Sequence, residues 1–283
     1  MQTLKSHTDG DSSLGYYDGP DLVDGLIESL RSAGLDPEAL DIDDLAALDE
    51  FHALGRAATQ SLAELAAVER DERVLDVGAG IGGPARVLAA RYGALVTALD
   101  GTPRFCSAAE MLTRGAGLED RVRIVLGDAL ALPFADATFD VVWTQAVGQN
   151  IADKRRFVAE LARVVRPGGR VAMFELVAGP GGPLEYPVPW ANGDDESWLV
   201  SAAELRDLLE SARLDVAHWR EGPAALEAIG AVAQSLPTRP AHQRLGLDLL
   251  MPDYEERMAG VARNIGQEKI ALVQVVARWR ERA

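Results

Sequence analysis

The stretch Val74–Gly83 reads VLDVGAGIGG and decides the fold of this chain. Its first part is an apolar run that contains one acid, Asp76, as expected of a buried strand, and Pro84–Leu88 continues as a helix. The glycines between them predict a tight turn, because glycine adopts backbone conformations closed to other residues and has no side chain to obstruct a ligand. This order predicts an α/β domain that binds a nucleoside-bearing cofactor.

Two cofactor patterns overlap in the turn. Gly78, Gly80 and Gly83 fit G-x-G-x-x-G, the pattern of dinucleotide-binding domains. Asp100 follows Gly80 by 20 residues, close to the expected position of an acid that binds the ribose of NAD. A tighter G-x-G-x-G pattern, with Gly82 in place of Gly83, fits equally well. The turn alone therefore leaves the cofactor open.

Further segments follow the turn in a defined order. Ala94–Asp100 and Val122–Ala129 each read as a buried strand that ends near an acid. A proline turn at Leu132–Phe134 leads into a fourth strand, Phe139–Trp143. After another helical stretch, the RPGGR sequence of Arg166–Arg170 stops the helix and opens a fifth strand. Alternating strands and helices predict a parallel sheet with crossover helices.

This order and the tighter glycine pattern resemble the class I S-adenosylmethionine (SAM)-dependent methyltransferases over residues 70–178. The resemblance implies an α/β fold with a Rossmann-like seven-stranded sheet, mostly parallel with an antiparallel last strand, plus N-terminal helices and a helical insertion before the last strand. It also implies SAM as the cofactor and S-adenosylhomocysteine (SAH) as the product. An NAD(P)-dependent oxidoreductase is the rival reading, weakened because the chain lacks the Tyr-x-x-x-Lys of short-chain dehydrogenases.

The remaining segments extend this domain on both sides. Asp21–Ala33 and Asp43–Ala67 read as amphipathic helices, and Ile270–Trp279 reads as the last strand. We divide the chain into an N-terminal helical lid and substrate segment, 1–69, and a SAM-binding methyltransferase domain, 70–283, with a helical insertion at about 222–267.

The resemblance also implies which residues hold SAM. Asp76 would pair with the methionine ammonium, and Asp100 would accept hydrogen bonds from both ribose hydroxyls. Asp128 would accept from the adenine amino group, and Ala129 would offer its backbone amide. Gly101 stands where the family usually places a bulkier residue, so we expect a looser adenine pocket. The full set of expected cofactor contacts is Asp76, Gly78, Gly80, Gly82, Asp100, Gly101, Thr102, Asp128, Ala129, Gln145 and Arg56.

The segment Phe51–Thr59, FHALGRAAT, resembles a Phe-His-x-x-Gly-x-x-Ala-Thr pattern of small-molecule members of the family. Arg56 could hold a carboxylate of SAM or of a substrate through its planar guanidinium. His52 lies one turn earlier and is the candidate general base that a hydroxyl acceptor would need. The alternative is that His52 is a hydrogen-bonded structural histidine and Arg56 forms a surface salt bridge.

The loop Trp143–Ile151, WTQAVGQNI, lies where the transferred methyl group would emerge. Ala146 stands where relatives often carry a histidine, so this loop supplies no obvious base. Gln149 can orient a substrate but cannot take a proton, and Asn150 is assigned to catalysis or, alternatively, caps the next helix. With so few bases, we favour an amine acceptor over a hydroxyl, carbon or thiol.

Aromatic residues give a further set of candidates. Tyr17 is assigned to catalysis near the methyl group, and Tyr16 and Trp190 are assigned to substrate binding, because aromatic faces stabilise a sulfonium or ammonium cation. Packing in the core is the alternative for each of them. We expect residues 1–20 to order over the pocket when cofactor and substrate bind.

Composition limits the partners. The formal net charge of −16 argues against nucleic acid and against an anionic membrane surface. Two basic residues stand against 13 acidic ones in the first 50, which indicates a solvated segment or an acidic lid that attracts cations. No apolar run approaches a spanning helix, Cys106 is the only cysteine, and the histidines have no metal-ligand spacing. These features predict a cytoplasmic protein without a metal, and the arginine-rich composition suggests a bacterial source.

Three functions remain open from the sequence. The first is a SAM-dependent methyltransferase that acts on a small molecule, with a homodimer as a conceivable assembly. The second is an NAD(P)-dependent oxidoreductase that uses the same glycine turn. The third is a SAM-binding protein without transfer activity, which Ala146 keeps in consideration.

Overall fold

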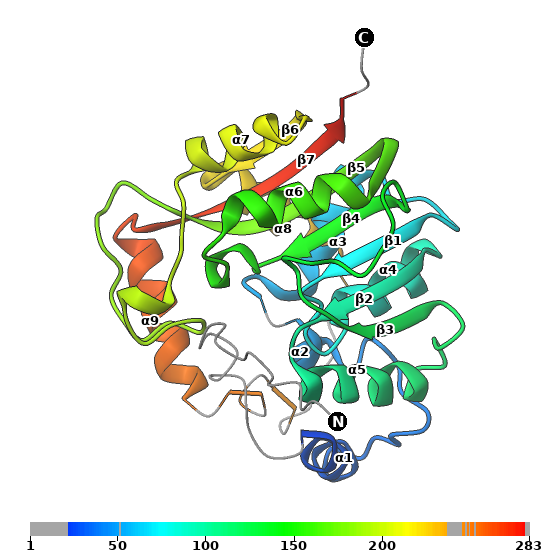
Figure 1. The fold of residues 1–283 in the computed structure, drawn as a ribbon. Helices are drawn as coiled ribbons and strands as arrows, with labels where there is room; N and C mark the ends of the chain where they lie inside the picture. The colour runs from blue at the N-terminus through cyan, green and yellow to red at the C-terminus, as the bar shows by residue number, and fades with distance from the viewer. Residues whose placement is uncertain are drawn as a thin grey trace, which may run out of the picture.

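The computed structural model describes residues 22–50, 52–236, 245–246, 248, 250–251 and 253–280, arranged as in Figure 1. The strands are β1 (Arg73–Val77), β2 (Leu95–Asp100), β3 (Val122–Leu126), β4 (Phe139–Gln145), β5 (Val165–Ala178), β6 (Leu214–Glu221) and β7 (Ile270–Trp279). The helices are α1 (Leu22–Ser32), α2 (Ala46–Asp49), α3 (Gly55–Ala66), α4 (Gly83–Tyr92), α5 (Pro103–Gly115), α6 (Lys154–Val164), α7 (Ala202–Ser211), α8 (Pro223–Ser235) and α9 (Tyr254–Gly266), with 3-10 turns η2 (Gly148–Asn150) and η3 (Asp194–Glu196).

These strands form one sheet in the order β3-β2-β1-β4-β5-β7-β6. Strands β1 to β5 pair in parallel, and β7 runs antiparallel to both of its neighbours, β5 and β6. Figure 1 shows β7, in red, beside β5. The predicted Rossmann-like sheet with an antiparallel last strand is therefore confirmed. Its order reverses between β1 and β4, which places a ligand-binding crevice at the carboxyl ends of these strands.

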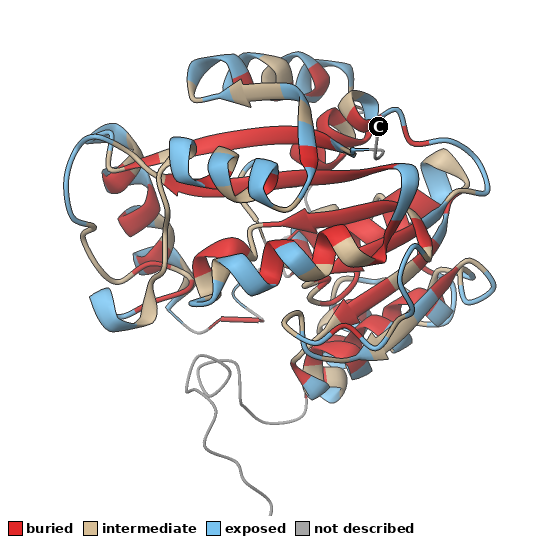
Figure 2. Cartoon of the chain, turned by 45° about the horizontal axis from the view of Figure 1, so that its top comes forward, coloured by how far each residue is buried: buried red, intermediate tan, exposed pale blue. Residues whose placement is uncertain are grey.

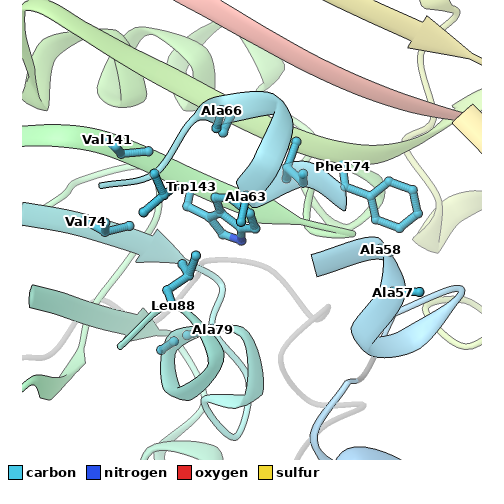
Figure 3. Close-up of a cluster of buried hydrophobic side chains, with 14 of the residues drawn as sticks. Ala57, Ala58, Ala63, Ala66, Val74, Ala79, Leu88, Val141, Trp143 and Phe174 are labelled. Carbon is cyan, nitrogen blue, oxygen red and sulfur yellow. The ribbon is translucent and has the colours of Figure 1, made fainter. Parts of the chain in front are cut away.

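Helices cover both faces of the sheet because side chains alternate along each strand. In β4, Val141 and Trp143 point to the face covered by α3, α4 and α8, and Val142 points to the face covered by α6 and α7. Trp143 is fully buried among side chains such as Leu88, as Figure 3 shows. Figure 2 shows the resulting layers, with buried strands between helices whose outer sides are exposed.

The N-terminal helices belong to the same packed body. Leu26 and Leu30 of α1 are fully buried and share a hydrophobic cluster with Phe105 and Leu112 of α5. Helix α1 thus lies against the helix that follows β2, and the backbone N–H of Leu40 donates to the carbonyl of Gly115 at the end of that helix.

Local signals decide most of the element boundaries. Ser201 and Glu204 form the capping box at the start of α7. The expected start of the fifth strand after RPGGR is wrong: β5 begins at Val165, and the turn loops out where the pairing register with β4 shifts. Gly169 fits there because a Cβ would lie 2.7 Å from the carbonyl oxygen of Asp140.

Two expectations involve residues that the structure does not describe. Helices α8 and α9 confirm a helical insertion before β7, but residues 237–244 between them lie outside the described part of the chain, as do Tyr16, Tyr17 and the expected lid, 1–20. No helix among the described residues has the length and hydropathy needed to cross a membrane.

Candidate cofactor and substrate site

A cavity of about 710 Å³ opens at the carboxyl ends of β1, β2 and β4. This volume is typical of a site for a small molecule or cofactor. The cavity wall contains most of the residues singled out from the sequence: His52, Asp76, Gly78, Gly80, Asp100, Gly101, Thr102, Asp128, Ala129, Gln145, Gln149, Asn150 and Trp190.

The glycine turn after β1 forms one side of the cavity. Gly78 and Gly80 have φ values of +75° and +55°, in the left-handed region that favours glycine. A Cβ on Gly78 would lie 2.3 Å from Val147 Cγ2, so the turn also requires glycine for its close approach to the loop after β4. The backbone N–H groups of Gly78 and Ala79 donate to the carbonyl of Leu99, which holds the turn on β2.

Asp100 organises this turn from the end of β2. Its Oδ2 accepts a hydrogen bond from the backbone N–H of Gly80 at 2.8 Å, and its Oδ1 accepts from that of Thr102 at 2.8 Å. Burial raises the pKa of the Asp100 carboxyl, and these backbone donors act in the opposite direction. Each carboxylate oxygen still has acceptor capacity for a ribose hydroxyl.

Asp76 is the most informative residue of the cavity. Its side chain is 1% exposed, and its Oδ2 has no hydrogen-bond partner among the described residues. Burial, followed by the nearby charges of Asp100 and Glu50, raises the pKa of Asp76 to about 8. A buried carboxylate without a partner is costly, so this position suits a ligand that brings a positive charge.

Two glutamines present further unpaired atoms to the cavity. Gln145 Oε1 accepts from Trp143 Nε1 at 2.9 Å and from Thr59 Oγ1 at 3.2 Å, which leaves the buried Nε2 without an acceptor among the described residues. Gln149 Nε2 donates to the carbonyl of Ala146 at 2.6 Å and leaves its buried Oε1 without a donor there. The two glutamines therefore offer one donor group and one acceptor to the cavity.

His52 lines the cavity, and both nitrogens of its ring have polar contacts within the protein. Nε2 lies 2.9 Å from Glu50 Oε2, and Nδ1 lies 3.2 Å from the carbonyl oxygen of Ala53. Although burial alone would raise the pKa of Glu50, the hydrogen bond with His52 and the charge of Arg56 lower it. Thr59 Oγ1 also lies 3.2 Å from Nε2, so both ring nitrogens have polar partners within the protein. The role of His52 as a general base stays a prediction.

Two predicted cofactor contacts lie behind the cavity wall. Arg56 is 7% exposed and contacts Asp43 Oδ1 at 3.0 Å and Glu50 Oε1 at 3.3 Å, so the structure does not bring its guanidinium into the cavity. Gly82 begins α4 with φ of +83°, and a Cβ there would lie 3.0 Å from Arg86 Nη1. Gly82 does not line the cavity, and its glycine leaves room for the Arg86 side chain.

Sequence reasoning missed the ion pair between Arg86 and Asp49. Arg86 is fully buried in α4, and its Nη2 lies 2.5 Å from Oδ1 of Asp49, which lines the cavity. Arg86 also contacts Thr113 Oγ1 at 3.3 Å. Gly83 allows the contact, because a Cβ there would lie 1.9 Å from the carbonyl oxygen of Asp49. The one signal was an arginine at a position of α4 flanked by apolar residues, Ala85 and Val87.

The remaining candidates take different positions. Trp190 lines the cavity, and its Nε1 donates to Ser197 Oγ at 2.9 Å. Asp128 Oδ1 accepts from the backbone N–H of Leu130 at 2.7 Å. The alternative that Asn150 caps the next helix is wrong, because Asp153 caps α6 and accepts from the backbone N–H of Arg156.

The charge of the cavity wall is negative. Its carboxylates are Asp49, Asp76, Asp100, Asp128 and Asp153, and no lysine or arginine lines it among the described residues. SAM carries two positive groups, the sulfonium and the ammonium, so this wall fits SAM better than a pyrophosphate-bearing dinucleotide.

Comparisons with known proteins agree with this site. The methyltransferase domain family model matches residues 75–173. The methyltransferase GfsG of Streptomyces halstedii is 33% identical over 256 residues, covering 88% of this chain and 84% of that protein. The probable chloroplastic tocopherol O-methyltransferase of rice is 44% identical over 105 residues, covering 37% of this chain and 29% of that protein.

A solved structure shows the same fold over nearly the whole chain. The [4+2]-cyclase SpnF superimposes with a TM-score of 0.63 at 22% identity, covering 95% of this chain and 97% of that one. This likeness concerns the fold alone, whereas the likeness to GfsG extends over most of both sequences. The chain therefore belongs to the class I SAM-dependent methyltransferase family, whose cofactor is SAM.

Proposed function

We propose that this chain transfers a methyl group from SAM to a small-molecule acceptor. The observation that carries the proposal is the buried Asp76 carboxyl, which has an unpartnered oxygen beside the glycine turn. The ammonium of SAM supplies the missing cation and donor. Asp100 then binds the ribose hydroxyls, Gln145 Nε2 donates to the methionine carboxylate, and Asp128 with Ala129 binds the adenine.

When bound, SAM supplies an electrophilic methyl group on its sulfonium and leaves as neutral SAH. The protein's task is to hold the acceptor in line with the methyl group and to exclude water. Gln149 Oε1 accepts a hydrogen bond from the acceptor, Trp190 forms an aromatic wall, and Asn150 orients the acceptor from η2.

The acceptor that we favour is an amine. His52 has both nitrogens on acceptors, and Gln145 and Gln149 cannot take a proton, so these residues suit a nucleophile with an available lone pair. A phenolic hydroxyl is the second candidate, because it ionises far more readily than an alcohol and the rice relative is named an O-methyltransferase. We keep a cytoplasmic location, a bacterial source and a homodimer as predictions.

Two measurements test this function. Calorimetry should show SAM and SAH binding in the micromolar range and no appreciable binding of NAD or NADP. Methyl-labelled SAM should then turn over with members of a panel of amines, phenols, alcohols and thiols, amines first. Binding of NAD without SAM would contradict the proposal. Binding of SAM without turnover on any class would favour a SAM-binding protein without transfer activity.

Asp100→Ala should weaken SAM binding by about 2–3 kcal/mol, because the ribose hydroxyls lose a charged acceptor and the Gly80 N–H loses its partner. The fold should survive, which circular dichroism checks. Asp140→Ala is the matched control, since Asp140 accepts from a backbone N–H at the opposite end of the sheet. Equal SAM affinity in folded Asp100→Ala and wild type would show that the ribose is held elsewhere.

A further inference from the structure

The loop that faces the acceptor is held by two oppositely charged side chains, the buried Glu175 and the half-buried Lys154. Glu175, on β5, accepts from the backbone N–H of Gly148 through Oε2 at 2.9 Å and from Thr144 Oγ1 through Oε1 at 3.3 Å. Lys154, at the start of α6, donates from Nζ to the carbonyls of Gly148 and Ile151. Both polar backbone groups of Gly148 are therefore held by charged side chains.

Gly148 lies close against the Glu175 carboxylate. A Cβ there would lie 2.9 Å from Glu175 Oε2, so glycine brings the backbone directly onto the carboxylate. Two residues before it, Ala146 has φ of +54°, a conformation that a residue with a Cβ rarely adopts without support. The contacts of Glu175 and Lys154 with Gly148 provide such support.

This loop forms the side of the cavity where the acceptor is proposed to bind. Gln149 and Asn150 follow Gly148 in η2 and line the cavity, and Gln149 Oε1 is the unpaired acceptor described above. The loop is also tied to the segment before α7, because the backbone N–H of Trp198 donates to the carbonyl of Gln149 at 3.0 Å. Any movement of Gly148 thus moves Gln149.

We propose that Lys154 and Glu175 are positioning residues for methyl transfer, which hold η2 so that Gln149 meets the acceptor substrate. Neither side chain lines the cofactor cavity, so neither touches the reacting groups. They act through the backbone of Gly148. We call the contacts of Lys154 and Glu175 with Gly148 the clamp. Its link to methyl transfer rests on the proposed function, whereas the clamp itself rests on these contacts alone.

The clamp has a pH window of its own. Burial raises the pKa of Glu175 to about 7, against the hydrogen bond from Gly148 and the charge of Lys154. Burial lowers the pKa of Lys154 to about 8, against the charge of Glu175. Both groups are charged between these values. Among the described residues that line the small space between α6, β5 and η2, these two are the titratable ones.

Hydrogen exchange tests the clamp without an acceptor. In the full chain, we expect Lys154→Met to lower the protection factor of the segment 146–151 at least tenfold at pH 7.5, and Lys154→Arg to restore most of it. Lys269→Met is the matched control, since Lys269 pairs with Glu185 and lines no part of the cavity. Wild-type protection should fall as the pH drops below 7, whereas Glu175→Gln should show no such fall.

Kinetics then tests the link to catalysis. With an acceptor from the panel, Lys154→Met and Glu175→Gln should lower kcat at least tenfold while the Kd of SAM changes less than threefold. Wild-type protection in Lys154→Met, or equal pH dependence in Glu175→Gln, would overturn the clamp. Lost protection with unchanged kcat would overturn its role in positioning. Failure of wild type to bind SAM would instead contradict the proposed function and leave the exchange result standing.

Discussion

Asp76→Asn should lower the affinity for SAM about 30- to 100-fold, or roughly 2–3 kcal/mol, because a buried charge-assisted hydrogen bond is replaced by a neutral one. The same variant should also lose the proton release that accompanies SAM binding in wild type. At pH 7 the wild-type carboxyl, with its pKa raised to about 8, is mostly protonated without a ligand. An ammonium beside it lowers that pKa, so SAM binding should release up to one proton.

Calorimetry in buffers of different ionisation enthalpy measures both effects. Wild type should release a proton at pH 7 and much less at pH 9, where Asp76 is already ionised, and Asp76→Asn should release none from this site at either pH. Asp153→Asn is the matched control, because it removes a carboxylate from the same cavity and asparagine caps a helix as well as aspartate. Wild-type affinity in a folded Asp76→Asn protein would place the ammonium elsewhere.

Arg86→Met should reduce the free energy of unfolding by about 3–5 kcal/mol, because it leaves Asp49 buried without its main cation. Burial raises the pKa of Asp49, and the charge of Arg86 works against that rise. Without Arg86 the pKa rises further, and a protonated Asp49 no longer needs a cation. The loss of stability should therefore be larger at pH 8 than at pH 5.

Urea unfolding at the two pH values checks this result. Arg91→Met is the matched control: its partner is Asp43, but its side chain is 42% exposed, so the loss should stay below about 1 kcal/mol. The double variant Arg86→Met/Asp49→Leu should recover much of the loss, since no unpaired charge remains. Equal losses in Arg86→Met and Arg91→Met would show that the buried pair contributes no more than a surface pair.

The features of the fold and the site that could be predicted are those that depend on residues adjacent in the sequence. The glycine turn, Asp76 and Asp100 were found because each lies at the end of a strand with its own hydrophobic pattern. The ion pair between Arg86 and Asp49 could not be found this way. Arg86 and Asp49 lie 37 positions apart, and no spacing rule joins two residues that meet only after the sheet has formed.

The same limit explains why the partners of His52 and Arg56 were not predicted. His52 carries the pattern of a base, but which protons it holds depends on Glu50 and the carbonyl of Ala53. Arg56 was expected at a ligand carboxylate, yet the carboxylates of Asp43 and Glu50 reach it first. In both cases an acid-rich segment supplies partners that the motif itself does not contain.

The close contact of Asp49 with Gly83 and Arg86 bears on how such enzymes can be recombined. Exchange of the segment before β1 between relatives must preserve its contact with α4. In this chain that segment contains Asp49, the carboxylate that the buried Arg86 of α4 requires, and its backbone passes α4 at Gly83, where a Cβ would lie 1.9 Å from the carbonyl oxygen of Asp49. A chimera would keep its stability only when the donor segment brings an acid to the place of Asp49, so the graft must be chosen by this contact as well as by specificity.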